Sequence, residues 1–205
     1  MEDKTNQLSD TLYNCLFADD PNYFEKMKSN NAISWIYNQE NPTYEKINSI
    51  IHDEEIESRI RFLASYTAIK RGLQIKVKYY FGTILEIPVK SGYDLLAFYS
   101  DLKARYYNFS GAKIIYEGGN KEIDELIKNT NKISEAVCNV IGPWEKARLD
   151  KPKGNIARFS YLVSDGLYFG QGPIDLMSKD KMGSSILASG SKLMLGLINL
   201  TNKKV

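Results

Sequence analysis

This 205-residue chain holds one histidine and two cysteines, so few arrangements of a histidine base with a nucleophile are open to it. His52 lies in the acidic stretch Ile51–Glu54, and no serine stands in the Gly-x-Ser-x-Gly context of a nucleophile elbow. A triad hydrolase needs a histidine base placed against its nucleophile. We therefore expect His52 to be an exposed residue between two helices, and the pattern favours a protein without a catalytic residue.

Metal and phosphate sites are not indicated either. Two cysteines and one histidine that lie far apart in the sequence cannot fill a closed zinc site, and the acidic runs lack the spacing of a calcium loop. Gly170 and Gly172 follow an expected strand, but Asp175 stands where a dinucleotide fingerprint needs its third glycine. We predict a structural turn at these glycines, and no metal or other cofactor.

Polar residues at expected strand ends and turns could line a pocket between the sheet and the N-terminal helices. This set consists of Arg105, Asn108, Asp165, Tyr168 and Gln171. It supports one alternative for the function, in which the protein is an enzyme or binds a small molecule.

Basic residues and tyrosines alternate along two expected strands and could form one outward face of the sheet. The set consists of Lys76, Lys78, Tyr80, Lys103, Arg105 and Tyr107, which Arg158 and Ser160 extend. Such a face can bind single-stranded nucleic acid, because cations meet phosphates and rings stack on bases. The net charge of only +2 argues against nucleic acid as the main partner, so this is the second alternative.

The first 54 residues predict short helices rather than a core of their own. Leu8, Leu12 and Leu16 have helical spacing, and Asp20–Pro21 and Asn41–Pro42 each have the form of an N-cap followed by proline. We expect three or four short helices over residues 1–54. They would form a wrap or a lid on an α+β core domain over residues 55–205.

Periodicity within residues 55–205 predicts a sheet flanked by helices. A helix is expected over residues 54–71, and strict alternation over residues 73–81 predicts a half-buried strand. Gly82 indicates a bulge or bend, and Pro88 an edge or an end of that strand. The run Leu95–Tyr99 is apolar throughout, which is typical of a central strand covered on both faces.

The remaining elements complete an antiparallel arrangement. Strands over residues 102–107 and 113–117 continue a meander, and a long helix is expected from Asn120 to Ile141. Two further strands around Asp165–Gly166 form a hairpin that Gly170–Pro173 would interrupt, and a last helix spans residues 184–200.

The predicted fold class is therefore α+β. It has a mainly antiparallel sheet, made of a meander plus a C-terminal hairpin, packed with three longer helices and preceded by short N-terminal helices. The order of elements resembles that of profilin-like and roadblock-like domains, with no motif that assigns the chain to either family.

The leading hypothesis for the function is a non-catalytic protein-interaction module, such as an adaptor, an accessory subunit or an immunity-type protein. Something must cover the second face of Leu95–Tyr99, and the N-terminal helices, a second copy of the chain or another protein could do so. The composition is that of a globular protein, and the two cysteines Cys15 and Cys138 suit a reducing compartment. No signal peptide or membrane span is evident, so we expect a cytoplasmic protein without membrane contact.

Overall fold

The computed structural model describes residues 10–202, so Leu8 of the first expected helix lies outside the described residues. The elements are α1 (Asp10–Phe17), a 3-10 helix η1 (Pro21–Met27), α2 (Ser34–Tyr37), α3 (Tyr44–His52), α4 (Ser58–Lys70), β1 (Tyr80–Val89), β2 (Gly92–Tyr99), β3 (Ala104–Tyr107), β4 (Lys113–Tyr116), α5 (Lys121–Cys138), β5 (Ile156–Val163), β6 (Gly166–Pro173), α6 (Ile174–Met177) and α7 (Lys181–Asn202).

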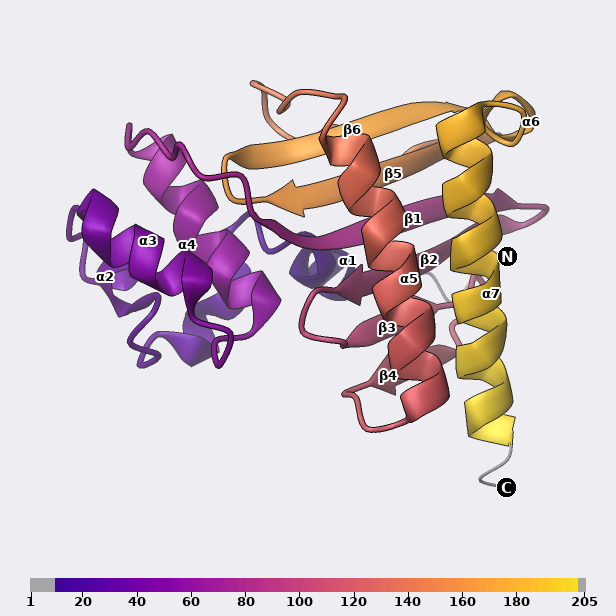
Figure 1. Cartoon of the computed structure of the whole chain (residues 1–205), viewed down its shortest axis with the longest axis horizontal. Helices are drawn as coiled ribbons and strands as arrows, with labels where there is room; N and C mark the ends of the chain where they lie inside the picture. Colours follow the sequence, from indigo (N-terminus) through magenta and orange to yellow (C-terminus); the bar gives the residue numbers. More distant parts are fainter. Residues whose placement is uncertain (1–9, 203–205) are drawn as a thin grey trace, which may run out of the picture.

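The six strands form one antiparallel sheet in the order β4-β3-β2-β1-β5-β6. Helices α5 and α7 lie side by side across one face, the α5/α7 face (Figure 1). The N-terminal helices pack against the opposite face and the ends of the strands, and α1 lies behind the sheet in this view. The predicted α+β class is confirmed. Within residues 10–202, no helix is both long enough and apolar enough to cross a bilayer.

Strand β2 separates two hydrophobic cores. Leu95, Ala97 and Tyr99 join the core beneath the N-terminal helices, whereas Leu96 and Phe98 join the core beneath α5 and α7. The expected central strand, covered on both faces, is therefore confirmed. Both covers come from the chain itself, and the face covered by the N-terminal helices is called the N-terminal face below.

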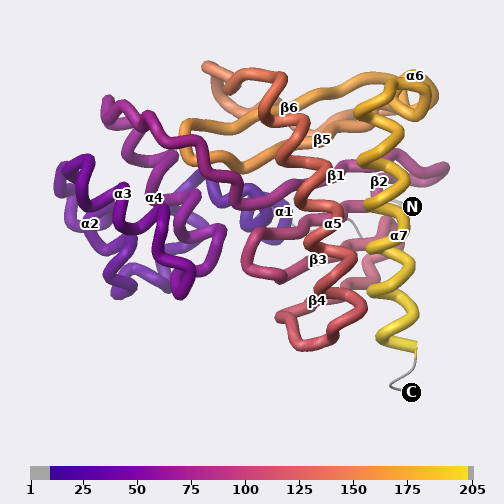
Figure 2. The backbone as a smooth tube through the Cα atoms, in the orientation of Figure 1, coloured from indigo at the N-terminus to yellow at the C-terminus, as the bar shows by residue number. Residues whose placement is uncertain are grey.

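The strand expected over residues 73–81 is wrong for most of its length. Residues 73–79 are extended, but they belong to no strand, and β1 begins only at Tyr80. Figure 2 shows them as an extended tube that leads from α4 into β1. Leu73, Ile75 and Tyr79 pack against the N-terminal core, while Lys76 and Lys78 are exposed. Alternating apolar and polar residues show that one side of an extended segment is buried. Packing against a hydrophobic core buries that side just as pairing in a sheet does.

Other boundaries also differ from the prediction. Gly170–Pro173 continues β6, because these residues pair with β5 as far as Ile156. Helix α4 starts at Ser58, four residues later than expected, and α5 ends at Cys138. The hairpin around Asp165–Gly166 is confirmed.

The expected domain boundary at residue 54 falls in the turn between α3 and α4. Helix α4 contacts both α3 and β1, and all the N-terminal helices share one hydrophobic core with the sheet. Whether residues 1–54 act as a wrap or as a lid stays a prediction.

Gly82 marks the expected bulge, since the pairing of β1 with β5 shifts between Tyr80 and Gly82. A Cβ atom on Gly82 would lie 2.6 Å from Cδ1 of Tyr99 and 2.8 Å from the carbonyl oxygen of Phe98. Both distances are shorter than a van der Waals contact, so β1 and β2 pack too closely here for any side chain.

Replacing Gly82 by alanine should lower the free energy of unfolding by roughly 1–3 kcal/mol, because the added methyl group overpacks the ladder. Urea denaturation followed by circular dichroism measures this loss. Gly170→Ala is the matched control, since it is also a strand glycine and no atom lies within 4 Å of its Cβ position. Equal stability of Gly82→Ala and the unaltered protein would contradict the close packing.

Candidate functional site

Five directly paired residues form a row across the N-terminal face of the sheet. The row is Tyr107 on β3, Leu95 on β2, Glu86 on β1, Arg158 on β5 and Gln171 on β6. It sets two opposite charges next to each other inside the protein, since Glu86 is 1% exposed and Arg158 is 4% exposed. Charged residues are almost never buried to this degree without a specific partner.

The carboxyl group of Glu86 is only half satisfied. Its Oε1 accepts a hydrogen bond of 2.7 Å from the hydroxyl of Tyr13, which belongs to α1. Its Oε2 is buried and accepts no hydrogen bond from any described residue, and Nη1 of Arg158 lies 3.7 Å from it. That distance gives Coulomb attraction but no hydrogen bond. One acceptor of a buried carboxyl group therefore remains open.

Arg158 uses its donors on other groups. Its Nε donates to Oε1 of Gln171 at 2.9 Å, and its two terminal nitrogens donate to the carbonyl oxygens of Leu149 and Asp150 at 3.2 and 2.8 Å. The guanidinium group thus binds the segment before β5, at Leu149 and Asp150, to the sheet. These bonds hold it away from a bidentate pairing with Glu86.

Burial controls the protonation of this group of residues. Loss of hydration raises the pKa of Glu86, although the hydrogen bond from Tyr13 and the positive charge of Arg158 act in the opposite direction. Burial also raises the pKa of Tyr13, and the negative charge of Glu86 adds to this rise. Tyr13 therefore keeps its proton and acts as the donor.

A cavity of about 430 Å³, the Glu86 cavity, lies against this row. It is enclosed by α1, the β1–β2 and β3–β4 turns and the segment before β5. Its lining consists of Tyr13, Glu86, Ser91, Gly92, Tyr93, Leu95, Tyr107, Asn108, Phe109, Lys151, Pro152, Lys153 and Gly154. The hydroxyl of Tyr93 donates to the carbonyl oxygens of Gly154 and Ile156 at 3.0 and 3.1 Å, which fixes the wall that the segment forms.

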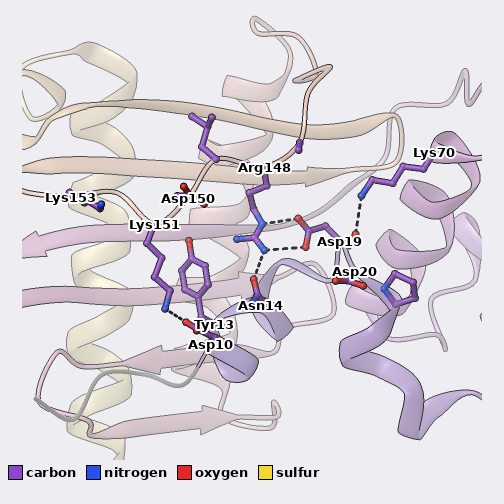
Figure 3. Close-up of a pocket in the computed structure, with 13 residues that line it drawn as sticks. Asp10, Tyr13, Asn14, Asp19, Asp20, Lys70, Arg148, Asp150, Lys151 and Lys153 are labelled. Carbon is purple, nitrogen blue, oxygen red and sulfur yellow. Dashed lines mark hydrogen bonds and ion pairs between the residues drawn. The ribbon is translucent and has the colours of Figure 1, made fainter. Parts of the chain in front are cut away.

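A second cavity of about 600 Å³, the Arg148 cavity, lies beside it (Figure 3). Tyr13, Lys151 and Lys153 line both cavities. Figure 3 shows Arg148 reaching from the segment before β5 to Asp19. Nε of Arg148 lies 2.7 Å from Oδ2 of Asp19. A separate ion pair of 2.6 Å joins Lys151 to Asp10.

The two cavities differ in whether their charged groups have hydrogen-bond or ion-pair partners. In the Arg148 cavity, the principal charges satisfy one another and link the segment before β5 to α1. In the Glu86 cavity, a buried carboxyl oxygen has no hydrogen-bond donor. An unsatisfied buried acceptor costs about 1–3 kcal/mol, which a ligand donor could recover. The Glu86 cavity is therefore the better candidate for a binding site.

The polar residues predicted to line a pocket are only partly brought together. Asn108 lines the Glu86 cavity, and Gln171 supports Arg158 at the end of the row. Arg105 lies on the same face but is bound to Glu117 and to backbone carbonyl groups. Asp165 and Tyr168 lie apart from the cavity. The hydroxyl of Tyr168, on the α5/α7 face, donates to the turn residue Asp165 at 2.8 Å.

The six residues of the predicted basic face do not share a face. Tyr80 is buried in the α5/α7 core, whereas Tyr107 is buried in the N-terminal core. Lys76 and Lys78 precede β1 and belong to no strand, so they are not part of a sheet face. Lys103 and Arg105 both lie in ion pairs with Glu117. The added residues Arg158 and Ser160 are buried.

His52 is exposed at the end of α3, as expected, and its Nδ1 lies 2.8 Å from the carbonyl oxygen of Asn48. No group of three or more His, Cys, Asp or Glu side chains in residues 10–202 is placed to share a metal ion. Cys138 is buried, which raises the pKa of its thiol to about 12 and makes it a poor nucleophile.

Sequence reasoning missed the central residues Tyr13, Glu86 and Arg158 as members of one site. One signal was available, because Glu86 is the single charged residue in the otherwise apolar run Tyr80–Val89. A single charge in a strand of otherwise uncharged residues indicates a buried polar site. Nothing in the local pattern indicates its partners.

Comparison with protein-family models gives no match, and neither a curated protein nor a solved structure is significantly similar to the chain. The resemblance in element order to profilin-like and roadblock-like domains thus gains no support. The function is therefore inferred from the residues of the site alone.

Replacing Glu86 by glutamine should stabilise the protein increasingly as the pH rises. Because burial raises the pKa of Glu86 above its ordinary value of 4.5, the stability that the protonated group provides is complete below that value. It is lost as the pH rises through the folded-state pKa, and glutamine does not titrate. Urea denaturation of both proteins from about pH 4 to about pH 7 measures the difference.

The exposed Glu145→Gln serves as the control for removing one negative charge. The gain in free energy of unfolding of Glu86→Gln over the unaltered protein should grow with pH. A gain that stays constant or shrinks as the pH rises would contradict the unfavourable burial of the Glu86 carboxylate.

Replacing Arg148 by methionine should loosen the segment before β5. The guanidinium group of Arg148 binds Asp19 and lies 4.1 Å from the ring centre of Phe17, so its loss breaks the link to the N-terminal helices. We expect thermolysin to cleave before Leu149 at least about tenfold faster, as measured by mass spectrometry of the fragments. Lys146→Met is the control, and equal cleavage of both variants would show that Arg148 does not hold the segment.

Proposed function

We propose that this protein binds a small organic molecule in the Glu86 cavity. The observation that carries this proposal is the buried Oε2 of Glu86, which has no hydrogen-bond donor among the described residues although Glu86 lines a cavity. Proteins seldom leave such an atom unsatisfied, and unsatisfied buried atoms occur where a ligand completes the bonding.

The size and the lining of the cavity support the proposal. Its volume of about 430 Å³ lies within the usual range for small-molecule sites. Tyr93, Leu95, Tyr107 and Phe109 provide an aromatic and aliphatic lining, and few polar groups are present. The sequence offered a pocket between the sheet and the N-terminal helices as an alternative, and of the residues expected there Asn108 lines the Glu86 cavity.

A role as a protein-interaction module stays a prediction, as does a cytoplasmic site of action. The reason for expecting a partner was the second face of β2, which α5 and α7 cover within the chain itself. Binding of nucleic acid through the basic face has also lost its structural basis, because the six residues do not share a surface.

A fragment screen by nuclear magnetic resonance tests the proposal. Small aromatic and aliphatic compounds should shift the backbone amide signals of residues that line the Glu86 cavity, such as Tyr93, Leu95 and Asn108. Leu95→Phe narrows the cavity from inside and should weaken these shifts. The amide spectrum of that variant reports directly whether it folds.

Phe109→Trp is the second variant, because Phe109 is 43% exposed and a larger ring there can be accommodated without disturbing a core. Shifts that scatter over the surface and are the same in the unaltered protein and both variants would sink the proposal. So would the absence of any fragment that binds the cavity at millimolar concentration.

A further inference from the structure

The inner end of the Glu86 cavity requires a hydrogen-bond donor. Oε1 of Glu86 already accepts a hydrogen bond from the hydroxyl of Tyr13. Arg158 donates its hydrogen bonds to Gln171, Leu149 and Asp150. Only Oε2 remains without a donor. A ligand group that fits this end therefore carries N–H or O–H.

The charges around Glu86 indicate that this donor is uncharged. The cationic side chains of Arg158, Arg148 and Lys151 all lower the pKa of Glu86, so each of them exerts a positive potential at its carboxyl group. Arg148 and Lys151 are paired with Asp19 and Asp10, but Arg158 lies 3.7 Å from Oε2 of Glu86 itself, so its guanidinium group would repel a cationic ligand group at this oxygen. A neutral N–H or O–H avoids that repulsion and still satisfies Oε2.

The walls of the cavity suit a flat, apolar body. Tyr107 is buried beside Leu95 in the row, and Tyr93 is held by its two hydrogen bonds to the segment before β5. Phe109 contributes a partly exposed ring. Aromatic rings pack well against other aromatic rings in stacked or edge-to-face arrangements.

The outer part of the cavity is positively charged. Among the side chains that line it, the charged ones are Glu86, Lys151 and Lys153. Lys153 is exposed and forms no ion pair with a residue of the described chain. Lys151 pairs with Asp10, but both side chains are exposed to solvent, and such a pair contributes little and exchanges readily. An anionic ligand group is therefore favoured here.

We propose that the ligand is a small aromatic acid. Its ring lies between the aromatic walls, a ring N–H or O–H donates to Oε2 of Glu86, and its carboxylate or phosphate group lies near Lys151 and Lys153. This inference rests on the proposed function and names the class of molecule that the same cavity takes.

Three commercial probes test separately the ring N–H donor and the anionic group of the proposed ligand. Indole-3-acetate has a ring N–H and a carboxylate, naphthalene-1-acetate keeps the carboxylate without an N–H, and tryptamine keeps the indole but carries an ammonium group. Isothermal titration calorimetry at about pH 7 measures their affinities. Indole-3-acetate should bind at least about tenfold more tightly than either of the others, since one net hydrogen bond to a buried charged or polar group corresponds to about that factor.

A variant tests the role of the outer cation. Lys153→Met should weaken indole-3-acetate about threefold and leave tryptamine unchanged or slightly tighter, since one exposed charge has an effect of this size. Lys132→Met, an exposed lysine on α5 across the sheet, is the control and should change neither affinity.

Different failures point to different conclusions. Equal binding of all three probes, weakened by Leu95→Phe, would overturn the ligand class and leave the proposed function intact. Tighter binding of tryptamine would show that the cavity takes organic cations instead. If no probe binds while other fragments in the screen do, the ligand class is also overturned. Only a cavity that takes no fragment of any kind overturns the proposed function itself.

Discussion

The burial of Glu86 beside Arg158 is the constraint around which the N-terminal face of the sheet is arranged. Two charges removed from water cost several kcal/mol each unless nearby groups replace their hydration. The replacement comes from three separate parts of the chain: Tyr13 on α1, Gln171 on β6, and the backbone of the segment before β5. Each of these parts is thereby held at the same place on the sheet, and α1 and the segment before β5 also border the Glu86 cavity.

A second buried charge shows that such burial need not create a binding site. Arg61 on α4 is 2% exposed, and it has no carboxylate partner among the described residues. It donates to the carbonyl oxygen of Ile51 and to the hydroxyl groups of Ser58 and Ser100. Its guanidinium group also lies over the rings of Tyr79 and Phe81. Arg61 thus links α3, α4 and the sheet. Its Nε is also buried without a hydrogen-bond acceptor among the described residues, but Arg61 lines neither the Glu86 cavity nor the Arg148 cavity.

Much of the fold could be read from local patterns because burial leaves a periodic trace in the sequence. The apolar run Leu95–Tyr99 predicted a strand covered on both faces, and Gly82 predicted the bulge. The same reasoning failed at residues 73–79, where alternation records contact with a surface and not pairing with a strand. It failed again at Gly170–Pro173, because pairing with β5 overrides the weak strand preference of glycine and proline.

The sequence by itself determined the α+β class, the mainly antiparallel sheet and the presence of a single histidine. These follow from periodicity, turn residues and composition, which act over a few neighbouring residues. Only the tertiary structure decided that Tyr13, Glu86 and Arg158 meet, since Tyr13 and Glu86 are 73 positions apart in the chain. Their meeting depends on strand register and on where α1 lies against the sheet. A one-residue shift of β1 would turn Glu86 to the opposite face, and no local pattern fixes that choice.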